Sequence, residues 1–116
     1  MTVAGGQAAR LFPLSPLTEV HQLLVDQVLD GWPQVETVDE HGVIVHYAAV
    51  RFTVFGAAAS FKGGADHIDV EANNHGRAVA SGLHGDAVGE ATVEATLPGN
   101  PEAPALRYLM RVVAAS

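Results

Sequence analysis

From residue 39 onward, short clusters of turn-forming residues interrupt this chain roughly every 10–20 residues. The clusters are 39–42, 62–66, 73–76, 84–86 and 98–101. Their Gly, Asn, Asp and Pro residues favour tight turns, because Gly accepts positive φ and Asn and Asp bond to the nearby backbone. Segments of this length between turns are typical of an antiparallel meander.

The segments between these turns carry β-strand patterns. In 89–97, apolar residues alternate with Glu and Thr without a break, which predicts a strand with one buried face. Residues 67–72 alternate in the same way. The run 43–55 is apolar on both faces, which predicts a central strand, interrupted near Ala48 and Ala49.

The stretch 105–115 fits either a strand or a helix. We favour a strand because Arg107 and Arg111 have the same four-residue spacing as Glu90 and Glu94. An antiparallel hairpin would set Glu94 opposite Arg107 and Glu90 opposite Arg111 on one face of the sheet. Exposed pairs of this kind contribute only about a few tenths of a kcal/mol each, so they indicate register rather than stability.

An amphipathic helix is expected over 16–30. Ser15 can cap its free N–H groups, and Pro16 suits the first helical position. Apolar residues then recur at helical spacing, namely Leu17, Val20, Leu24 and Val28. Gly31 suits a left-handed cap at its end, and Pro33 forbids continuation.

Together these elements predict an α+β fold in one domain, with the N-terminal helix packed on a curved antiparallel β-meander. The length of 116 residues allows a single core. The Ala-rich inner face of 89–97 leaves room for the helix, as in the roll-like shape of cystatin-like and hot-dog folds. Residues 1–14 are expected to form an arm, and residues 15–116 the domain.

Composition excludes several classes of partner. Thirteen acidic residues against six basic ones give a formal net charge of −7, which argues against nucleic acid or an anionic membrane as partner. The absence of Cys excludes disulfides, a thiolate nucleophile and Cys-ligated metals. No apolar stretch approaches the roughly 20 residues of a membrane span, and the N-terminus lacks a signal-peptide pattern. A cytoplasmic location is expected.

One candidate metal site lies on the strand 67–71. Period two places His67, Asp69 and Glu71 on one strand face. An imidazole and two carboxylates are ligands for Zn²⁺, Mn²⁺ or Fe²⁺, and a carboxylate beside His also suits acid–base chemistry. The alternative is a charged face turned to water. A metal site would need a further His from a neighbouring strand, either His46 or His75, of which His46 is the better candidate because it lies inside an apolar run.

A candidate ligand site is predicted from polar groups in apolar surroundings. His46, Tyr47 and Arg51 interrupt the apolar run 43–55, and Trp32 follows the expected helix. Side chains with polar tips of this kind would surround a pocket for an apolar small molecule between helix and sheet. The alternative for Arg51 is structural pairing with a carboxylate, or exposure on a strand face.

The motifs of common enzymes are missing. The chain has no phosphate-binding P-loop, no G-x-S-x-G elbow and no H-E-x-x-H pair. We therefore favour a non-catalytic module that binds a small molecule or oligomerises, most simply as a homodimer. The alternative is a small enzyme that uses a His/carboxylate or metal site. The sequence identifies no cofactor.

Overall fold

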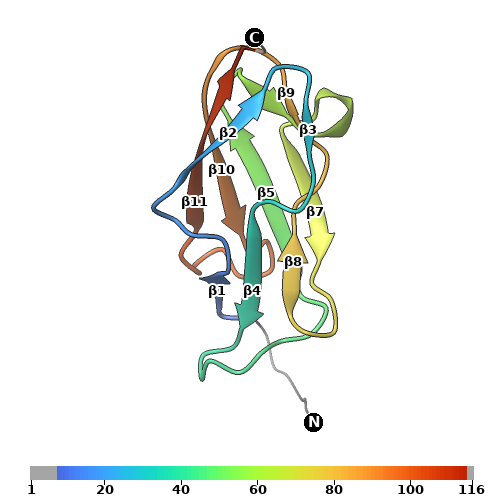
Figure 1. The fold of residues 1–116 in the computed structure, drawn as a ribbon. Coiled ribbons are helices and arrows are strands. Elements are labelled where there is room, and N and C mark those ends of the chain that lie inside the picture. Colours follow the sequence, from blue (N-terminus) through green and yellow to red (C-terminus); the bar gives the residue numbers. More distant parts are fainter. Residues whose placement is uncertain (1–7, 115–116) are drawn as a thin grey trace.

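The computed structural model describes residues 8–114, which fold into three β-sheets arranged as a two-layer sandwich (Figure 1). The strands are β1 (Arg10–Pro13), β2 (Val20–Leu24), β3 (Val28–Leu29), β4 (Gln34–Val38), β5 (Ala49–Phe55), β6 (Ala59–Ser60), β7 (His67–Glu71), β8 (Arg77–Val79), β9 (Leu83–Gly85), β10 (Gly89–Thr96) and β11 (Leu106–Val113). The one helical element among these residues is a 3₁₀ turn, η1 (Lys62–Gly64). Within this range no helix has the length and apolar character needed to cross a membrane.

The first sheet has five strands in the order β2-β11-β10-β5-β7. Its central strand, β10, pairs antiparallel with both β11 and β5. The strands predicted over 67–72 and 89–97 are confirmed as β7 and β10, and the ambiguous C-terminal stretch contains the strand β11 (Leu106–Val113) rather than a helix. The edge strand β2 pairs with β11 in parallel. The predicted meander contained only antiparallel pairs, so this pairing differs from the prediction.

The second layer consists of two three-stranded sheets, β1-β4-β8 and β3-β9-β6, which we call together the second sheet. Backbone hydrogen bonds between Gly31 and Ala80 and between Ala80 and Pro33 join the two parts. The junction lies between the β3–β9 pairing and the β4–β8 pairing, where four residues of one strand (30–33) face three of the other (80–82). The junction is therefore a β-bulge. The Asp30 carboxylate accepts a hydrogen bond of 2.8 Å from Gly82 N across this junction.

The core lies between the two sheets. Alternate residues of β5, β10 and β11 point inward, as their burial shows: Val50, Phe52, Val54, Ala91, Val93, Ala95, Tyr108, Met110 and Val112. Leu11, Val35, Ala78 and Leu83 face them from the second sheet. Small Ala side chains let the sheets approach, and large rings fill the remaining space. The buried Tyr108 hydroxyl donates to Gln34 O at 3.4 Å, and burial raises its pKa to about 12.

The helix predicted over 16–30 is wrong. The segment forms β2 and β3, separated by a turn in which Asp26 has a φ of 69°. All four residues of the expected buried stripe are exposed: Leu17, Val20, Leu24 and Val28. Leu23, outside that stripe, is the buried residue. Ser15 does not cap a helix, because its hydroxyl accepts a hydrogen bond from Gln34 N at 2.9 Å.

The physical reason lies in the spacing of the apolar residues. Val20, Leu24 and Val28 are four residues apart, and a spacing of four fits a helix and also one face of a strand. Pairing with β11 satisfies the backbone of β2 and puts Leu23 into the core. Val20 and Leu24 then necessarily point away from it.

The α+β roll is therefore also wrong, because the second sheet occupies the place expected for the helix. The predicted central strand 43–55 is present only in its second half, as β5; Tyr47 has a φ of 60°, which interrupts the extended backbone. Within the expected arm, Arg10–Pro13 forms β1 and pairs with β4. Residues 1–7 lie outside the described residues.

Close contact between β9 and the β2–β3 turn gives a test of this fold. A methyl group at Gly85 would lie 2.6 Å from Leu24 O and 3.2 Å from Val112 Cγ1. We expect Gly85→Ala to lower the free energy of unfolding by about 1–3 kcal/mol, the usual cost of overpacking. Urea denaturation measures this. In the matched control Gly99→Ala, the added methyl meets nothing within 4 Å. Equal stabilities of the two variants would contradict the fold at this contact.

Candidate functional site

The outer face of the five-stranded sheet carries two ion pairs that join β10 and β11. Glu94 lies opposite Arg107 and Glu90 opposite Arg111, so the predicted register is confirmed. Arg107 Nε donates to Glu94 Oε2 at 2.9 Å, and Arg111 Nη2 to Glu90 Oε2 at 3.0 Å. Thr92 and Leu109 form a cross-strand pair, and each ion pair lies two residues from it along the strands. The charges therefore border that position on both sides.

Between the two ion pairs runs an exposed row, which we call the outer row and define as Val20, Leu109, Thr92 and Phe55. The registers place these residues next to one another on β2, β11, β10 and β5, in that order. Val20, Leu109 and Phe55 are each about half exposed, at 49%, 50% and 52%. Shallow hollows of about 170 and 390 Å³ lie along the row.

A row of this kind is different from scattered apolar residues. Single exposed apolar side chains are normal on a protein surface, whereas contiguous ones with a polar border mark an interaction site. A second apolar pair, Leu24 and Val113, lies beyond the Glu90–Arg111 pair on the same face. Along β11 the outer face thus alternates between charged and apolar positions, and the outer row extends across four strands.

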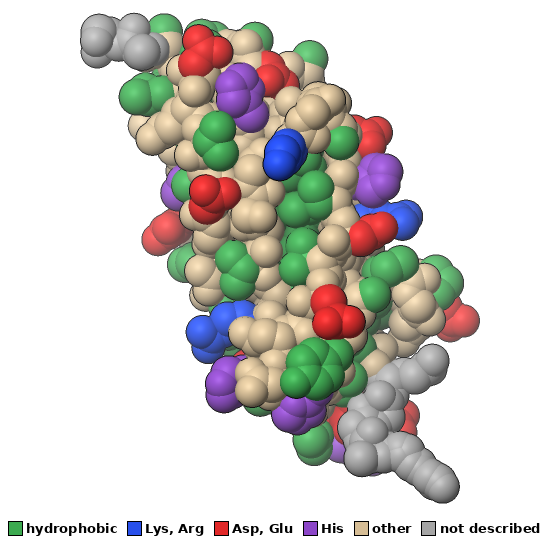
Figure 2. Space-filling model, turned by 90° about the vertical axis from the view of Figure 1, so that its right-hand side faces the viewer, with side chains coloured by type: hydrophobic (Ala, Val, Ile, Leu, Met, Phe, Trp, Pro, Cys, Tyr) green, Lys and Arg blue, Asp and Glu red, His purple; other side chains and the backbone are tan. Residues whose placement is uncertain are grey.

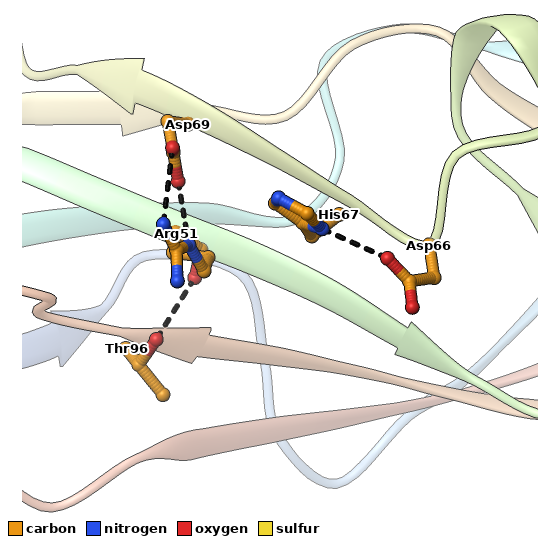
Figure 3. Close-up of polar contacts among 5 residues, drawn as sticks. All are labelled: Arg51, Asp66, His67, Asp69 and Thr96. Carbon is orange, nitrogen blue, oxygen red and sulfur yellow. Dashed lines mark hydrogen bonds and ion pairs between the residues drawn. The ribbon is translucent and has the colours of Figure 1, made fainter.

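Arg51, predicted to bind a ligand, points to the same outer face and is already paired. Its Nε and Nη2 donate to the two carboxylate oxygens of Asp69 at 2.7 and 3.2 Å (Figure 3). Thr96 Oγ1 donates to Arg51 O at 3.4 Å. The hydrogen bond from Arg51 holds the pKa of the Asp69 carboxyl below its ordinary value. The carboxylate pairing given as the alternative for Arg51 is thus present, and a ligand-binding role for Arg51 stays a prediction.

The three candidate metal ligands lie along β7 with different partners. His67 Nδ1 lies 2.8 Å from Asp66 Oδ1 (Figure 3), and this contact lowers the pKa of Asp66. Asp69 is held by Arg51, and Glu71 lies opposite Ala49. Across residues 8–114, no group of three His, Asp or Glu side chains is arranged to hold a metal ion. The metal site stays a prediction.

The other predicted ligand-binding residues lie in separate surroundings. His46 lines a pocket of about 240 Å³ with Leu97 and Asn100. Tyr47 is 59% exposed, and its ring centroid lies 6.1 Å from that of His46. Trp32 stacks on His21 at 4.7 Å and meets the edge of Tyr108 at 5.6 Å. The structure therefore does not bring Trp32, His46 and Arg51 together in the way the sequence prediction required.

A polar cluster that the sequence did not predict as a site surrounds His84. Its Nδ1 lies 2.7 Å from Asp86 Oδ1, and its Nε2 lies 3.9 Å from Asp26 Oδ1. Hydrogen bonds from Ser60 and His84 lower the pKa of the Asp86 carboxyl. His84 and Asp86 border a pocket of about 480 Å³, whose wall also contains Phe61 and Lys62.

The order of contacts in this cluster does not suit nucleophilic catalysis. A catalytic triad needs the imidazole between the hydroxyl and the carboxylate, whereas both ring nitrogens of His84 lie near carboxylates, Asp86 at 2.7 Å and Asp26 at 3.9 Å. Figure 2 shows the right-hand side of the molecule in Figure 1, where acidic, basic and histidine side chains are spread among apolar ones.

The fold makes this chain a two-sheet β-sandwich domain. Immunoglobulin and fibronectin type III domains share that architecture, which hosts many functions and assigns none. Comparison of the sequence with protein-family models and with curated proteins finds no match. The function must therefore be argued from the surface itself.

The Arg51–Asp69 pair gives a test of the outer-face electrostatics. In Arg51→Gln, we expect the pKa of Asp69 to rise towards its ordinary value, because the charged hydrogen bonds are lost. Since the folded pKa is lowered, the stability from this pair is present at neutral pH and is lost as pH falls through that folded pKa. NMR titration of the side-chain carboxyl carbons measures the shift. In Arg111→Gln, the Asp69 pKa should not change; an equal rise there would contradict the pairing.

Proposed function

We propose that this chain is a non-catalytic assembly module that associates with itself through the outer face of its five-stranded sheet. The observation that carries the proposal is the outer row, in which three half-exposed apolar side chains and Thr92 lie in one line across four strands, with an ion pair on either side of its two middle positions. Burial of apolar surface is the main driving force of most protein association. The ion pairs on either side supply a polar border.

The charge of this face supports self-association. The chain as a whole carries a net charge of −7, and two copies repel at long range. At the outer row, however, two Glu and two Arg balance each other. The row is therefore a neutral region of an acidic protein, where two copies can approach with the least electrostatic cost.

A lysine in the middle of the outer row tests the proposal. We expect Leu109→Lys to weaken self-association at least roughly tenfold, equivalent to ~1.4 kcal/mol, because a buried unpaired charge is costly. Sedimentation velocity over a range of concentrations measures this. The matched control is Val43→Lys, at an apolar residue that is 57% exposed and lies in the β4–β5 connection. A wild-type chain that stays monomeric at high concentration would refute the proposal.

A second candidate function is the binding of a small apolar molecule in the pocket beside His84. The pocket of about 480 Å³ is walled by Val28, Phe61 and Lys62 with Gly63 and Gly64. Its volume falls within the roughly 300–1,000 Å³ of ligand sites, which are mainly apolar with a few polar groups. Lys62 would favour an anionic group on the ligand.

Anilinonaphthalene sulfonate, an apolar anion, is a suitable probe for this pocket. We expect its fluorescence to rise with the wild-type chain and to fall by more than half in Lys62→Gln, since the sulfonate loses its cation. In Leu109→Lys, the signal should persist. If instead Leu109→Lys abolishes the signal and Lys62→Gln leaves it unchanged, the probe binds the outer row and the pocket proposal fails.

A further inference from the structure

We infer that two copies of the chain stack face to face about a twofold axis that runs along the strands between β10 and β11, as a closed dimer. This inference rests on the proposed self-association and adds the relation between the copies. It follows from the order of side chains on the outer face. Both the apolar row and the charges lead to the same axis.

About this axis, the side chains of the outer row in one copy face side chains of complementary size in the partner. In order across the sheet, the row is Val20, Leu109, Thr92 and Phe55. A twofold rotation about an axis that runs along the strands, between β10 and β11, places the row of one copy over the row of its partner in the reverse order. Val20 then faces the partner's Phe55, and Leu109 faces the partner's Thr92. Each large side chain meets a smaller one, which favours interdigitation of the two faces.

The charges select the same axis. The rotation sets Glu90 over the partner's Arg111 and Glu94 over the partner's Arg107, so that opposite charges face each other on both sides of the row. A twofold axis across the strands would instead set Glu90 over the partner's Glu94. It would also set Arg107 over the partner's Arg111. Like charges in direct opposition disfavour that arrangement.

The geometry also limits the size and strength of the assembly. The contact covers β2, β11, β10 and β5 and leaves β7 free. With strands about 4.8 Å apart and about 3.4 Å per residue, its footprint is roughly 20 by 20 Å, or ~400 Å² for each copy. Standard interfaces bury about 800 Å² on each side, so this dimer is weak. A twofold contact uses the same patch on both copies, so association stops at two.

Cross-linking tests this arrangement, because the chain has no cysteine of its own. Val20→Cys and Phe55→Cys place single thiols at the two ends of the row, at half-exposed positions that leave the core intact. A short bis-maleimide is added to each variant alone and to an equal mixture, at a concentration where the wild-type chain associates. Products are identified by mass.

We expect the mixed product, Val20→Cys joined to Phe55→Cys, to exceed either homotypic product at least fivefold. In the twofold dimer, the two Val20 positions are three strand spacings apart in the plane of the sheet, or roughly 14 Å. Homotypic products that dominate would overturn this axis in favour of one across the strands. A wild-type chain that does not associate would instead refute the proposed function, so the two failures are distinguishable.

Charge reversal provides a second test that also reports on folding. Arg107→Glu with Arg111→Glu makes the border wholly acidic, and Glu90→Lys with Glu94→Lys makes it wholly basic. Each double variant alone should associate at least tenfold more weakly than the wild type. An equal mixture should form a heterodimer, which also shows that both variants are folded. Undiminished association of either variant alone would overturn the charge contacts.

Discussion

The antiparallel pairing of β10 with β11 is the interaction on which the rest of this structure depends. Its register, from Gly89 opposite Val112 to Ala95 opposite Leu106, decides which side chains enter the core and which face outward. On the inner side it brings Ala91, Val93 and Tyr108 into one cluster. On the outer side it forms both ion pairs and centres the outer row. A shift of one residue would exchange the two faces.

The N-terminal segment then completes both sheets. Its first part, β1, pairs with β4 in the second sheet, and its second part, β2, pairs in parallel with β11 in the first. The chain thus passes from the second sheet to the first between β1 and β2. There, β2 covers the edge of β11 and adds Val20 to the outer row. The same crossing leaves Val20 and Leu24 exposed, and the proposed assembly would bury Val20.

The sequence predicted the parts of the fold that depend on local periodicity. The strict alternation in 89–97 and the equal spacing of Glu90, Glu94, Arg107 and Arg111 correctly predicted a hairpin and its register. The segment 16–30 was misread because a spacing of four residues fits a helix and one face of a strand. The outer row could not be predicted, since its members, at positions 20, 55, 92 and 109, become neighbours only through the sheet order. For His84 and Asp86, the sequence indicated only a turn.

The central claim is that two copies meet through the outer face of the five-stranded sheet. Backbone amide NMR spectra recorded over a dilution series test it most directly, because they report on every strand at once. The account predicts concentration-dependent shifts on β2, β11, β10 and β5, largest around Leu109 and Thr92, with β4 and β8 unchanged. Shifts confined to the second sheet or to the pocket beside His84, or no shifts at all, would contradict it.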